Sequence, residues 1–264
     1  MLNLGPDRLF LMGWRGVLRA AGGPAPGAPD LLAYLRSSCT RFFVFTNDVA
    51  ETPAAHATWA WEHGLALSGD DFLTPSALAV DRIRARFPGR PVLVTGAPAL
   101  GEALAAAGVP TAEERRTELP VVCAGPGGAV EEAALLARAA GCVRRGAPFY
   151  AVDPARLPPV LAATGRRPEG LGKPEPGCVD HALCRRPGIQ RSGVVVVGGS
   201  RDAALARAAG VRGVRIDPEA KNPEDGTAVS AVDGLDGLLA LLSGEADPMA
   251  AAWRRVSGDA ERYY

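Results

Sequence analysis

The side chains best suited to chemistry in this sequence are a few cations and one acid that follow short apolar runs. Arg15 lies in a tight glycine turn after the first such run, and Asp48 follows a run that ends in Thr46-Asn47. A guanidinium binds phosphate or carboxylate through two parallel hydrogen bonds. Asp48 is either a general acid or base, or a cap or turn residue before the next helix. Lys173 is one of only two lysines in a chain whose basic residues are otherwise arginine and histidine.

The elements that must position these side chains follow a repeating order. Short apolar runs alternate with amphipathic stretches rich in alanine and leucine, which is typical of α/β units with parallel strands. The pattern predicts strands at residues 9–12, 42–46, 92–95, 121–124, 148–152, 194–198 and 211–216. It predicts helices at residues 29–37, 52–63, 76–86, 97–107, 129–141, 178–185 and 201–209. The four valines at 194–197 predict a central strand buried on both faces, and the glycines after them let a ligand approach the backbone.

Composition bounds the class of protein. A chain of 264 residues suits one large domain or a domain with an inserted second one. Lys plus Arg and Asp plus Glu each number 29, so no overall charge attracts nucleic acid or anionic lipid. The five cysteines have no C-x-x-C spacing and predict buried thiols in a reducing compartment. Because no run of about 18 uncharged apolar residues is present, we expect a soluble cytoplasmic protein without nucleic-acid or membrane partners.

Six segments carry a resemblance to a known family. They are the apolar strand and glycine turn at 9–18, Pro-Ala-Pro-Gly-Ala at 24–28, Phe-Phe-Val-Phe-Thr-Asn-Asp at 42–48, Thr-Pro-Ser-Ala at 74–77, Gly-Lys-Pro at 172–174 and Val-Val-Val-Val-Gly-Gly at 194–199. In order and spacing they resemble the haloacid dehalogenase superfamily, in particular subfamily IIA, the nitrophenylphosphatase, phosphoglycolate phosphatase and nucleotide-phosphatase group. The resemblance implies an α/β fold: a Rossmann-like parallel-sheet core at residues 1–73 and 171–264, and an inserted α/β cap at residues 74–170.

The resemblance also implies how the catalytic centre is built. In that family an aspartate attacks phosphorus, a second aspartate protonates the leaving group, and Mg²⁺ bridges the nucleophile and the phosphoryl oxygens. A threonine and a lysine hold those oxygens. Thr46 and Lys173 match these two positions, whereas Gly13, Arg15 and Gly199 stand at the three aspartate positions. The catalytic motifs are therefore degenerate.

These departures change the expected function. A site without the nucleophile, the general acid and the oxygen ligands of Mg²⁺ is not expected to hydrolyse phosphomonoesters by the family's route. We expect instead a cleft without metal or cofactor in which Arg15, Thr46, Asn47 and Lys173 accept a phosphate or carboxylate anion. The protein is then a non-hydrolytic binder. The alternative is a repurposed, metal-independent bacterial enzyme for isomerisation, cyclisation or elimination, with Asp48 and Arg15 as its catalytic residues.

The cap departs from the family as well. Residues 149–153 resemble the family's cap strand that ends in Thr-Asn, but the loop at 154–167 is shorter than the loop that normally helps to close the cleft. We therefore carry over no substrate from the family. Because caps of this family often mediate dimers, a homodimer is one expected assembly.

Other polar residues leave alternatives open. Trp14 either stacks on a flat ligand or fills the volume vacated by the metal and its ligands. Asp202 is either a displaced family acid or an acid favoured by a helix N-terminus. His56, His63 and His181 have no mutual spacing that predicts a metal site, and we expect His181 to be solvated.

The remaining distinctive segments predict no site. Cys123 ends an apolar run and is expected in the core. The glycine-rich run at 125–128 contains no lysine, so it is not expected to be a phosphate loop. Residues 218–226 are polar and predict a surface loop, and the pattern at 244–264 is too weak to assign.

Overall fold

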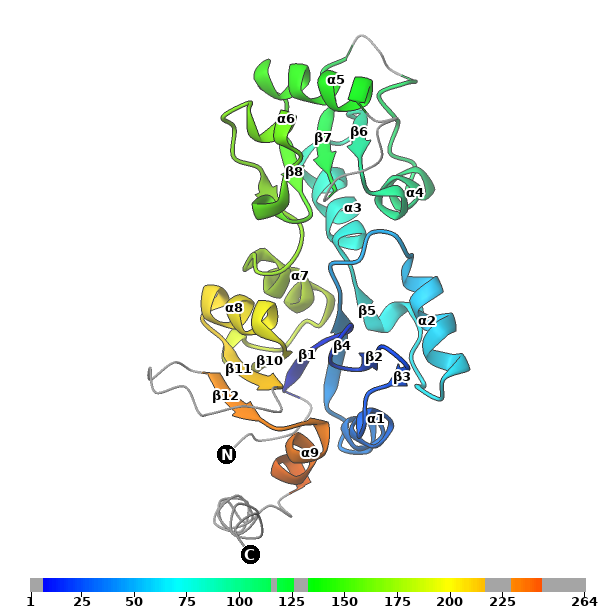
Figure 1. The fold of residues 1–264 in the computed structure, drawn as a ribbon, viewed down its shortest axis with the longest axis vertical. Coiled ribbons are helices and arrows are strands. Elements are labelled where there is room, and N and C mark those ends of the chain that lie inside the picture. The colour runs from blue at the N-terminus through cyan, green and yellow to red at the C-terminus, as the bar shows by residue number, and fades with distance from the viewer. Residues whose placement is uncertain (1–6, 115–117, 126–132, 217–228, 244–264) are drawn as a thin grey trace, which may run out of the picture.

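Two parallel sheets organise the molecule, one above the other in Figure 1. The computed structural model describes residues 7–114, 118–125, 133–216 and 229–243. The larger sheet contains β1 (Leu9–Gly13), β4 (Arg41–Phe45), β5 (Phe72–Leu73), β10 (Val194–Gly198), β11 (Arg212–Ile216) and β12 (Val229–Val232). The smaller contains β6 (Val92–Thr95), β7 (Val121–Ala124), β8 (Phe149–Ala151) and β9 (Glu169–Gly170). The strand orders are β12-β11-β10-β1-β4-β5 and β6-β7-β8-β9.

The central strand β1 decides how the larger sheet is packed. It lies between β10 and β4, with Phe10 opposite Val195 on one side and Phe42 on the other. Successive side chains of a strand point to opposite faces, so Leu11 enters one hydrophobic core and Phe10 enters another. Burial on both faces explains why β1 and the valines of β10 are uninterrupted apolar runs.

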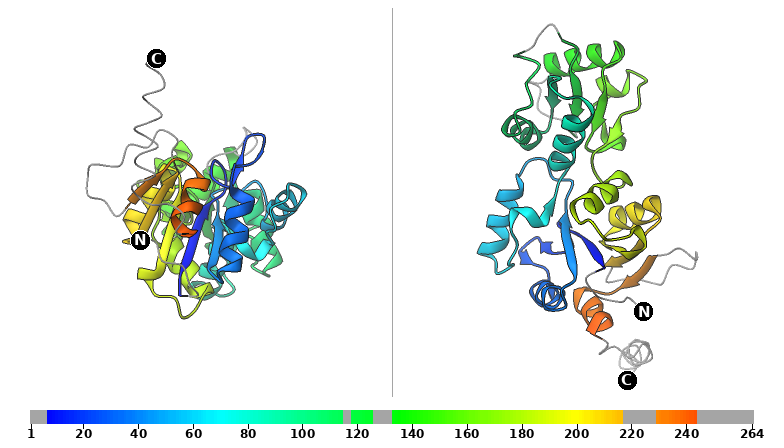
Figure 2. Two further views of the ribbon diagram at one scale, coloured as in Figure 1. Left: turned by 90° about the horizontal axis from the view of Figure 1, so that it is seen from below. Right: turned by 180° about the vertical axis from the view of Figure 1, so that it is seen from behind.

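Helices cover both faces of the larger sheet, as the two further views in Figure 2 show. One core cluster takes apolar side chains from α1 (Ala28–Ser37), α2 (Pro53–Glu62) and α9 (Leu235–Ser243). The other takes them from α7 (Gly177–Arg185) and α8 (Ser200–Ala209). A short antiparallel pair, β2 (Arg19–Ala20) and β3 (Gly23–Pro24), follows β1.

The smaller sheet is packed in the same way. Helices α3 (Pro75–Arg86) and α4 (Pro98–Ala106) share one of the clusters of the larger sheet, which continues to β7 and β8. Helices α5 (Ala133–Arg144) and α6 (Pro159–Ala162) form a third cluster with the opposite face. Short 3-10 helices span Gly69–Asp71, Pro154–Arg156 and Arg191–Gly193. Cys123 is fully buried in β7, and burial raises the pKa of its thiol to about 12, which confirms its expected place in the core.

Local sequence signals explain where two helices begin. The Thr52 hydroxyl accepts a hydrogen bond from the backbone N–H of Ala55 at 3.2 Å, and Thr74 caps α3 in the same manner. Each threonine is followed by a proline, whose fixed φ suits the first helical position and whose missing N–H is not needed there. Threonine-proline pairs thus fix the starts of α2 and α3.

The predicted mixed α/β class with parallel strands is confirmed. The predicted strands and helices recur with shifts at their ends. The two-residue strands β2, β3, β5 and β9, strand β12 and helices α6 and α9 had no counterpart in the prediction. The predicted loop at 218–226, the segment at 244–264, most of the glycine-rich run at 125–128 and the start of the helix predicted at 129–141 lie outside the described residues. The division into a core and a cap at residues 74–170 stays a prediction. No helix among the described residues is long and apolar enough to cross a membrane.

One prediction about exposure is wrong. His181 was expected in solvent, but its side chain is buried between α7 and α3, with Nδ1 3.4 Å from Oδ2 of Asp81. The helix turns His181 onto the same face as Cys178, which is also buried. Burial lowers the pKa of His181, an effect that Asp81 opposes.

Candidate functional site

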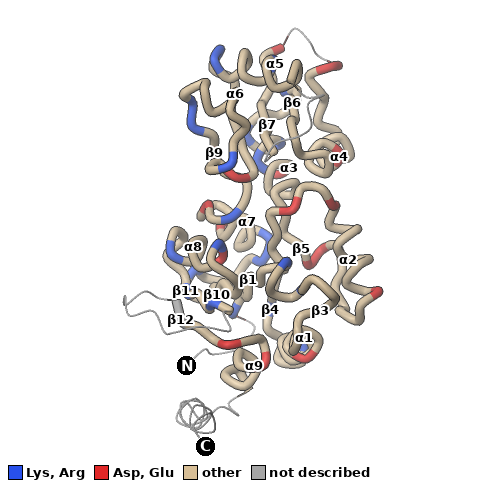
Figure 3. The backbone as a smooth tube through the Cα atoms, viewed as in Figure 1, with Lys and Arg blue, Asp and Glu red and all other residues tan. Residues whose placement is uncertain are grey.

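A cleft of about 690 Å³ opens where β1 and β4 end and α8 begins. It is lined by Trp14, Arg15, Gly16, Val17, Phe45, Thr46, Asn47, Asp48, Ala50, Lys173, Gly199, Ser200, Arg201 and Asp202. All six residues that the sequence predicted for a site are in this lining, because parallel strands bring their carboxyl ends to one edge. Figure 3 shows that basic and acidic positions are interspersed along the described chain, so charge at the cleft depends on local pairing.

Asn47 fixes the turn that carries Lys173. Its Nδ2 donates to the Lys173 carbonyl at 2.8 Å, and its Oδ1 accepts from the Lys173 backbone N–H at 2.8 Å. The preceding Gly172 allows this approach, since a Cβ there would lie 2.6 Å from the Asn47 Oδ1. Both polar atoms of the Asn47 amide are therefore engaged in holding the backbone of residue 173.

Lys173 points inward and forms an ion pair with Asp202. Its Nζ donates to Asp202 Oδ1 at 2.6 Å and to the carbonyl of Phe45 at 3.0 Å. Only 7% of Lys173 and 6% of Asp202 are exposed. The other carboxylate oxygen of Asp202 accepts the Gly199 N–H at 3.1 Å, so the acid also caps α8. Asp202 is therefore an acid at a helix N-terminus, which was one of the two interpretations of the sequence. It also neutralises the charge of Lys173.

The Asp202 carboxylate lies beside the end of β1. A Cβ added at Gly13 would lie 3.0 Å from Asp202 Oδ2 and 2.8 Å from Cγ2 of Val17. Contacts this short force the neighbouring groups to move. The position that the family resemblance assigns to the nucleophile is thus one where the surroundings leave no space for a side chain.

Arg15 is paired with a different acid. Its Nη2 lies 2.5 Å from Asp48 Oδ2 and 3.7 Å from Glu51 Oε1. The Arg15 side chain is 59% exposed, whereas that of Asp48 is 10% exposed. Arg15 therefore covers the largely buried carboxylate of Asp48 from the solvent side.

Asp48 has the geometry of a turn residue. Its Oδ1 accepts the Ala50 N–H at 2.9 Å, and its own N–H donates to the Thr46 hydroxyl. Burial pushes the pKa of Asp48 upward, but the hydrogen bond from Ala50 and the charge of Arg15 hold that pKa below its usual value. Asp48 is therefore ionised at neutral pH, which does not suit a general acid.

Trp14 fills volume under the cleft. It is 1% exposed and packs edge-on against Trp59 and Phe72, with ring centroids 5.3 and 5.2 Å away. Among the described residues its Nε1 has no hydrogen-bond partner. Because almost none of its surface is exposed, the packing favours the interpretation that Trp14 fills volume over the interpretation that it stacks on a flat ligand.

Three residues near the cleft were missed by sequence reasoning. Arg201 lines the cleft, and its Nη2 lies 3.3 Å from Oδ2 of Asp153, the residue that caps the 3-10 helix after β8. Glu51 and His56 lie behind Asp48, and Nδ1 of His56 is 2.9 Å from Glu51 Oε2. Burial lowers the pKa of His56, although Glu51 opposes this effect. The sequence signal for this group is the short spacing from Asp48 to His56, since the spacings between the histidines carry no such signal.

Part of the chain matches the model of a known protein family. Residues 10–110 match a family model described as haloacid dehalogenase-like hydrolase. No match was found among curated proteins.

Solved structures share the fold at low sequence identity. A 4-nitrophenylphosphatase from Thermotoga maritima has a TM-score of 0.75 and 22% identity, over 88% of this chain and 97% of its own. NagD from Escherichia coli K-12 has a TM-score of 0.72 and 21% identity, over 88% of this chain and 96% of its own. A glycerol phosphate phosphatase from Mycobacterium tuberculosis, in complex with magnesium, has a TM-score of 0.72 and 24% identity, over 89% of this chain and 78% of its own. The chain thus has the fold of the nitrophenylphosphatase and NagD-like proteins, and its residues 10–110 match the haloacid dehalogenase-like hydrolase family.

Proposed function

We propose that this protein does not hydrolyse phosphomonoesters with Mg²⁺ and instead binds a small phosphate or carboxylate anion in the cleft without converting it. The absence of hydrolysis is supported mainly by one observation, the ion pair between Lys173 and Asp202 beside Gly13. In the family the corresponding lysine holds a phosphoryl oxygen. In this chain the carboxylate of Asp202 occupies the place of that phosphoryl oxygen.

The loss of hydrolysis follows from the residues at the centre. Gly13 offers no nucleophile, Arg15 cannot donate a proton at neutral pH, and Gly199 offers no side-chain oxygen for a metal. Asp202 is the one carboxylate beside Gly13 in the described part of the cleft, and Lys173 neutralises it. Mg²⁺ requires near-octahedral oxygen ligands, commonly from one or two carboxylates and the substrate phosphate, and a single carboxylate already paired with lysine is a poor substitute.

Hydrogen-bond donors around the cleft support anion binding. The lining carries three cations, Arg15, Lys173 and Arg201, and two carboxylates, Asp48 and Asp202. The contacts of Arg15 with Asp48 and Glu51 use only Nη2, so its other N–H groups are available to a ligand. The first three residues of α8 line the same cleft, and a helix N-terminus favours negative charge. The alternative hypothesis is that the ion pairs within the cleft only stabilise the fold and that the cleft binds no anion.

Calorimetric titration separates these accounts. Phosphate, sulfate and small carboxylates are titrated into the parent protein, Arg15→Ala and the control Arg144→Ala, which changes an exposed residue of α5. A charge-assisted hydrogen bond contributes roughly 1.5–3 kcal/mol, so Arg15→Ala should weaken binding at least about tenfold. The control should match the parent. Absence of binding at millimolar anion, or binding unchanged in Arg15→Ala, would refute the proposal, and turnover of the bound anion would favour metal-free catalysis.

A further inference from the structure

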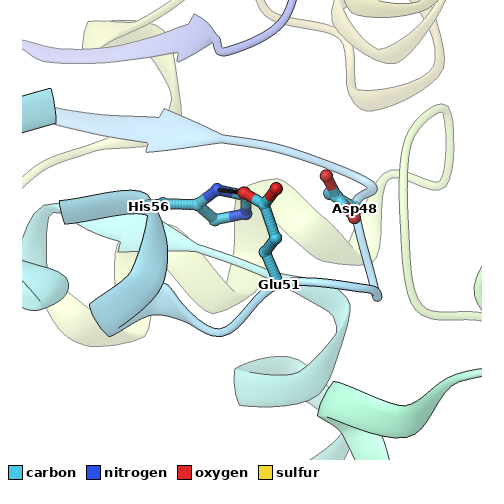
Figure 4. A group of neighbouring side chains, drawn as sticks. All are labelled: Asp48, Glu51 and His56. Atoms are coloured by element: carbon cyan, nitrogen blue, oxygen red, sulfur yellow. Dashed lines mark ion pairs between the residues drawn. The ribbon is translucent and has the colours of Figure 1, made fainter. Parts of the chain in front are cut away.

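Three ligand-type side chains converge behind the cleft within one short segment. Asp48, Glu51 and His56 come from the loop after β4 and the first turns of α2, and Figure 4 shows their polar ends directed toward one another. One ligand-type atom from each residue lies within 4.8 Å of the other two. The two carboxylates are partly exposed, whereas the imidazole is fully buried.

The environment of His56 points to a missing partner. The side chain is 0% exposed, and its Nε2 has no hydrogen-bond partner among the described residues. Nδ1 lies 2.9 Å from Glu51 Oε2 but is not aligned for a hydrogen bond. A buried polar nitrogen without a partner is costly. A cation held jointly with the two carboxylates would engage one of these nitrogens.

We propose that Asp48, Glu51 and His56 form a binding site for a transition-metal cation such as Zn²⁺. One imidazole and two carboxylates are ligands that Zn²⁺ accepts, whereas an imidazole is a poor ligand for Mg²⁺ or Ca²⁺. Three protein ligands leave one tetrahedral position open. The site is distinct from the centre at Gly13, Arg15 and Gly199 where the family resemblance places its aspartates, and it does not depend on the proposed anion binding.

Arg15 is the built-in competitor of this metal. Its Nη2 occupies the space between Asp48 and Glu51, at 2.5 Å from one carboxylate and 3.7 Å from the other. The metal must replace this positive charge, and the guanidinium can swing out because the side chain is 59% exposed. The ligand atoms must also draw together, since bonds of about 2.0–2.2 Å place tetrahedral ligands roughly 3.4 Å apart. Arg19 can stay in place, 3.5 Å from Glu51 Oε2 and stacked over Trp59.

The test is a zinc titration of the whole chain after treatment with chelator. Calorimetry with ZnCl₂ should give one site per chain in the parent, and Co²⁺ should bind with visible d–d absorption. Glu51→Gln and His56→Gln should each weaken Zn²⁺ binding at least about tenfold. Arg15→Gln should strengthen it at least about threefold, because a competing charge is removed. His63→Gln, at an exposed position directly after α2, is the matched control and should bind like the parent.

Several outcomes would overturn the proposal. They are the absence of binding in the parent, affinity unchanged by Glu51→Gln, and a loss in His63→Gln equal to that in Glu51→Gln. Glu51 is 36% exposed, so its substitution remains informative even where substitution of the buried His56 prevents folding. The readout is separate from the anion experiment, because loss of the Arg15 guanidinium should weaken anion binding and strengthen zinc binding.

Discussion

Restoring the family nucleophile should destabilise this protein. In Gly13→Asp, the new Cβ would meet Cγ2 of Val17 at 2.8 Å and Oδ2 of Asp202 at 3.0 Å. Overpacking of this kind costs about 1–3 kcal/mol. The new carboxylate would also lie close to that of Asp202. Two like charges about 4 Å apart repel by about 4 kcal/mol at an effective dielectric constant of 20, and Lys173 beside Asp202 offsets part of this repulsion. We therefore expect a loss of several kcal/mol and no phosphatase activity.

Urea unfolding of matched variants separates the two costs. Gly13→Ala introduces the steric cost alone and should lose about 1–3 kcal/mol. Gly13→Asp should lose more, and adding Asp202→Asn to it should recover the electrostatic part. A free energy of unfolding for Gly13→Asp within about 0.5 kcal/mol of the parent would refute the packing argument, because that is the range of neutral surface changes.

Three further predictions concern the charged and buried groups. Lys173→Ala should cost about 3–5 kcal/mol of unfolding free energy because it leaves Asp202 buried and unpaired, and Lys173→Ala with Asp202→Ala should cost less; equal losses in chemical denaturation would contradict this. Asn47→Ala should lose about 1–3 kcal/mol through the two hydrogen bonds to residue 173, whereas Asn47→Asp, which keeps the acceptor, should lose less by the same assay. Because burial lowers the pKa of His181, the unfolded chain takes up a proton first as the pH falls below about 6.5, so stability declines from about pH 7.5 to pH 5.5. His181→Gln should show a shallower decline in melting curves across that range, and parallel declines would count against the buried neutral imidazole.

The sequence predicted the elements whose patterns are local. Strands β1 and β10 are buried on both faces, so each is a continuous apolar run that predicts a buried strand from the sequence alone. Strands β5 and β9 have two residues each and follow from pairing with β4 and β8, which no local pattern encodes. Short strands of this kind depend on tertiary contact.

The sequence identified six residues of the cleft lining, but it identified neither Arg201 nor the partners of the charged residues. Parallel topology brings Arg15, Thr46 and Lys173 to one cleft. Their partners are separated by 33 residues for Arg15 with Asp48 and 29 for Lys173 with Asp202, so the pairs depend on how α8 and the loop after β4 are seated. The sequence left open whether these cations face a ligand or an internal acid. The structure gives each of them an internal acid.

The central claim is most directly tested by hydrolysis of p-nitrophenyl phosphate by the purified chain with millimolar Mg²⁺, with and without chelator. A working nucleophile, general acid and metal site would give turnover in the ordinary enzymatic range, on the order of 1 s⁻¹ or faster. With Gly13, Arg15 and Gly199 at the three positions that the family resemblance assigns to aspartates, release of nitrophenol should equal that in buffer and should not respond to the chelator. Turnover in the enzymatic range that the chelator abolishes would contradict the account.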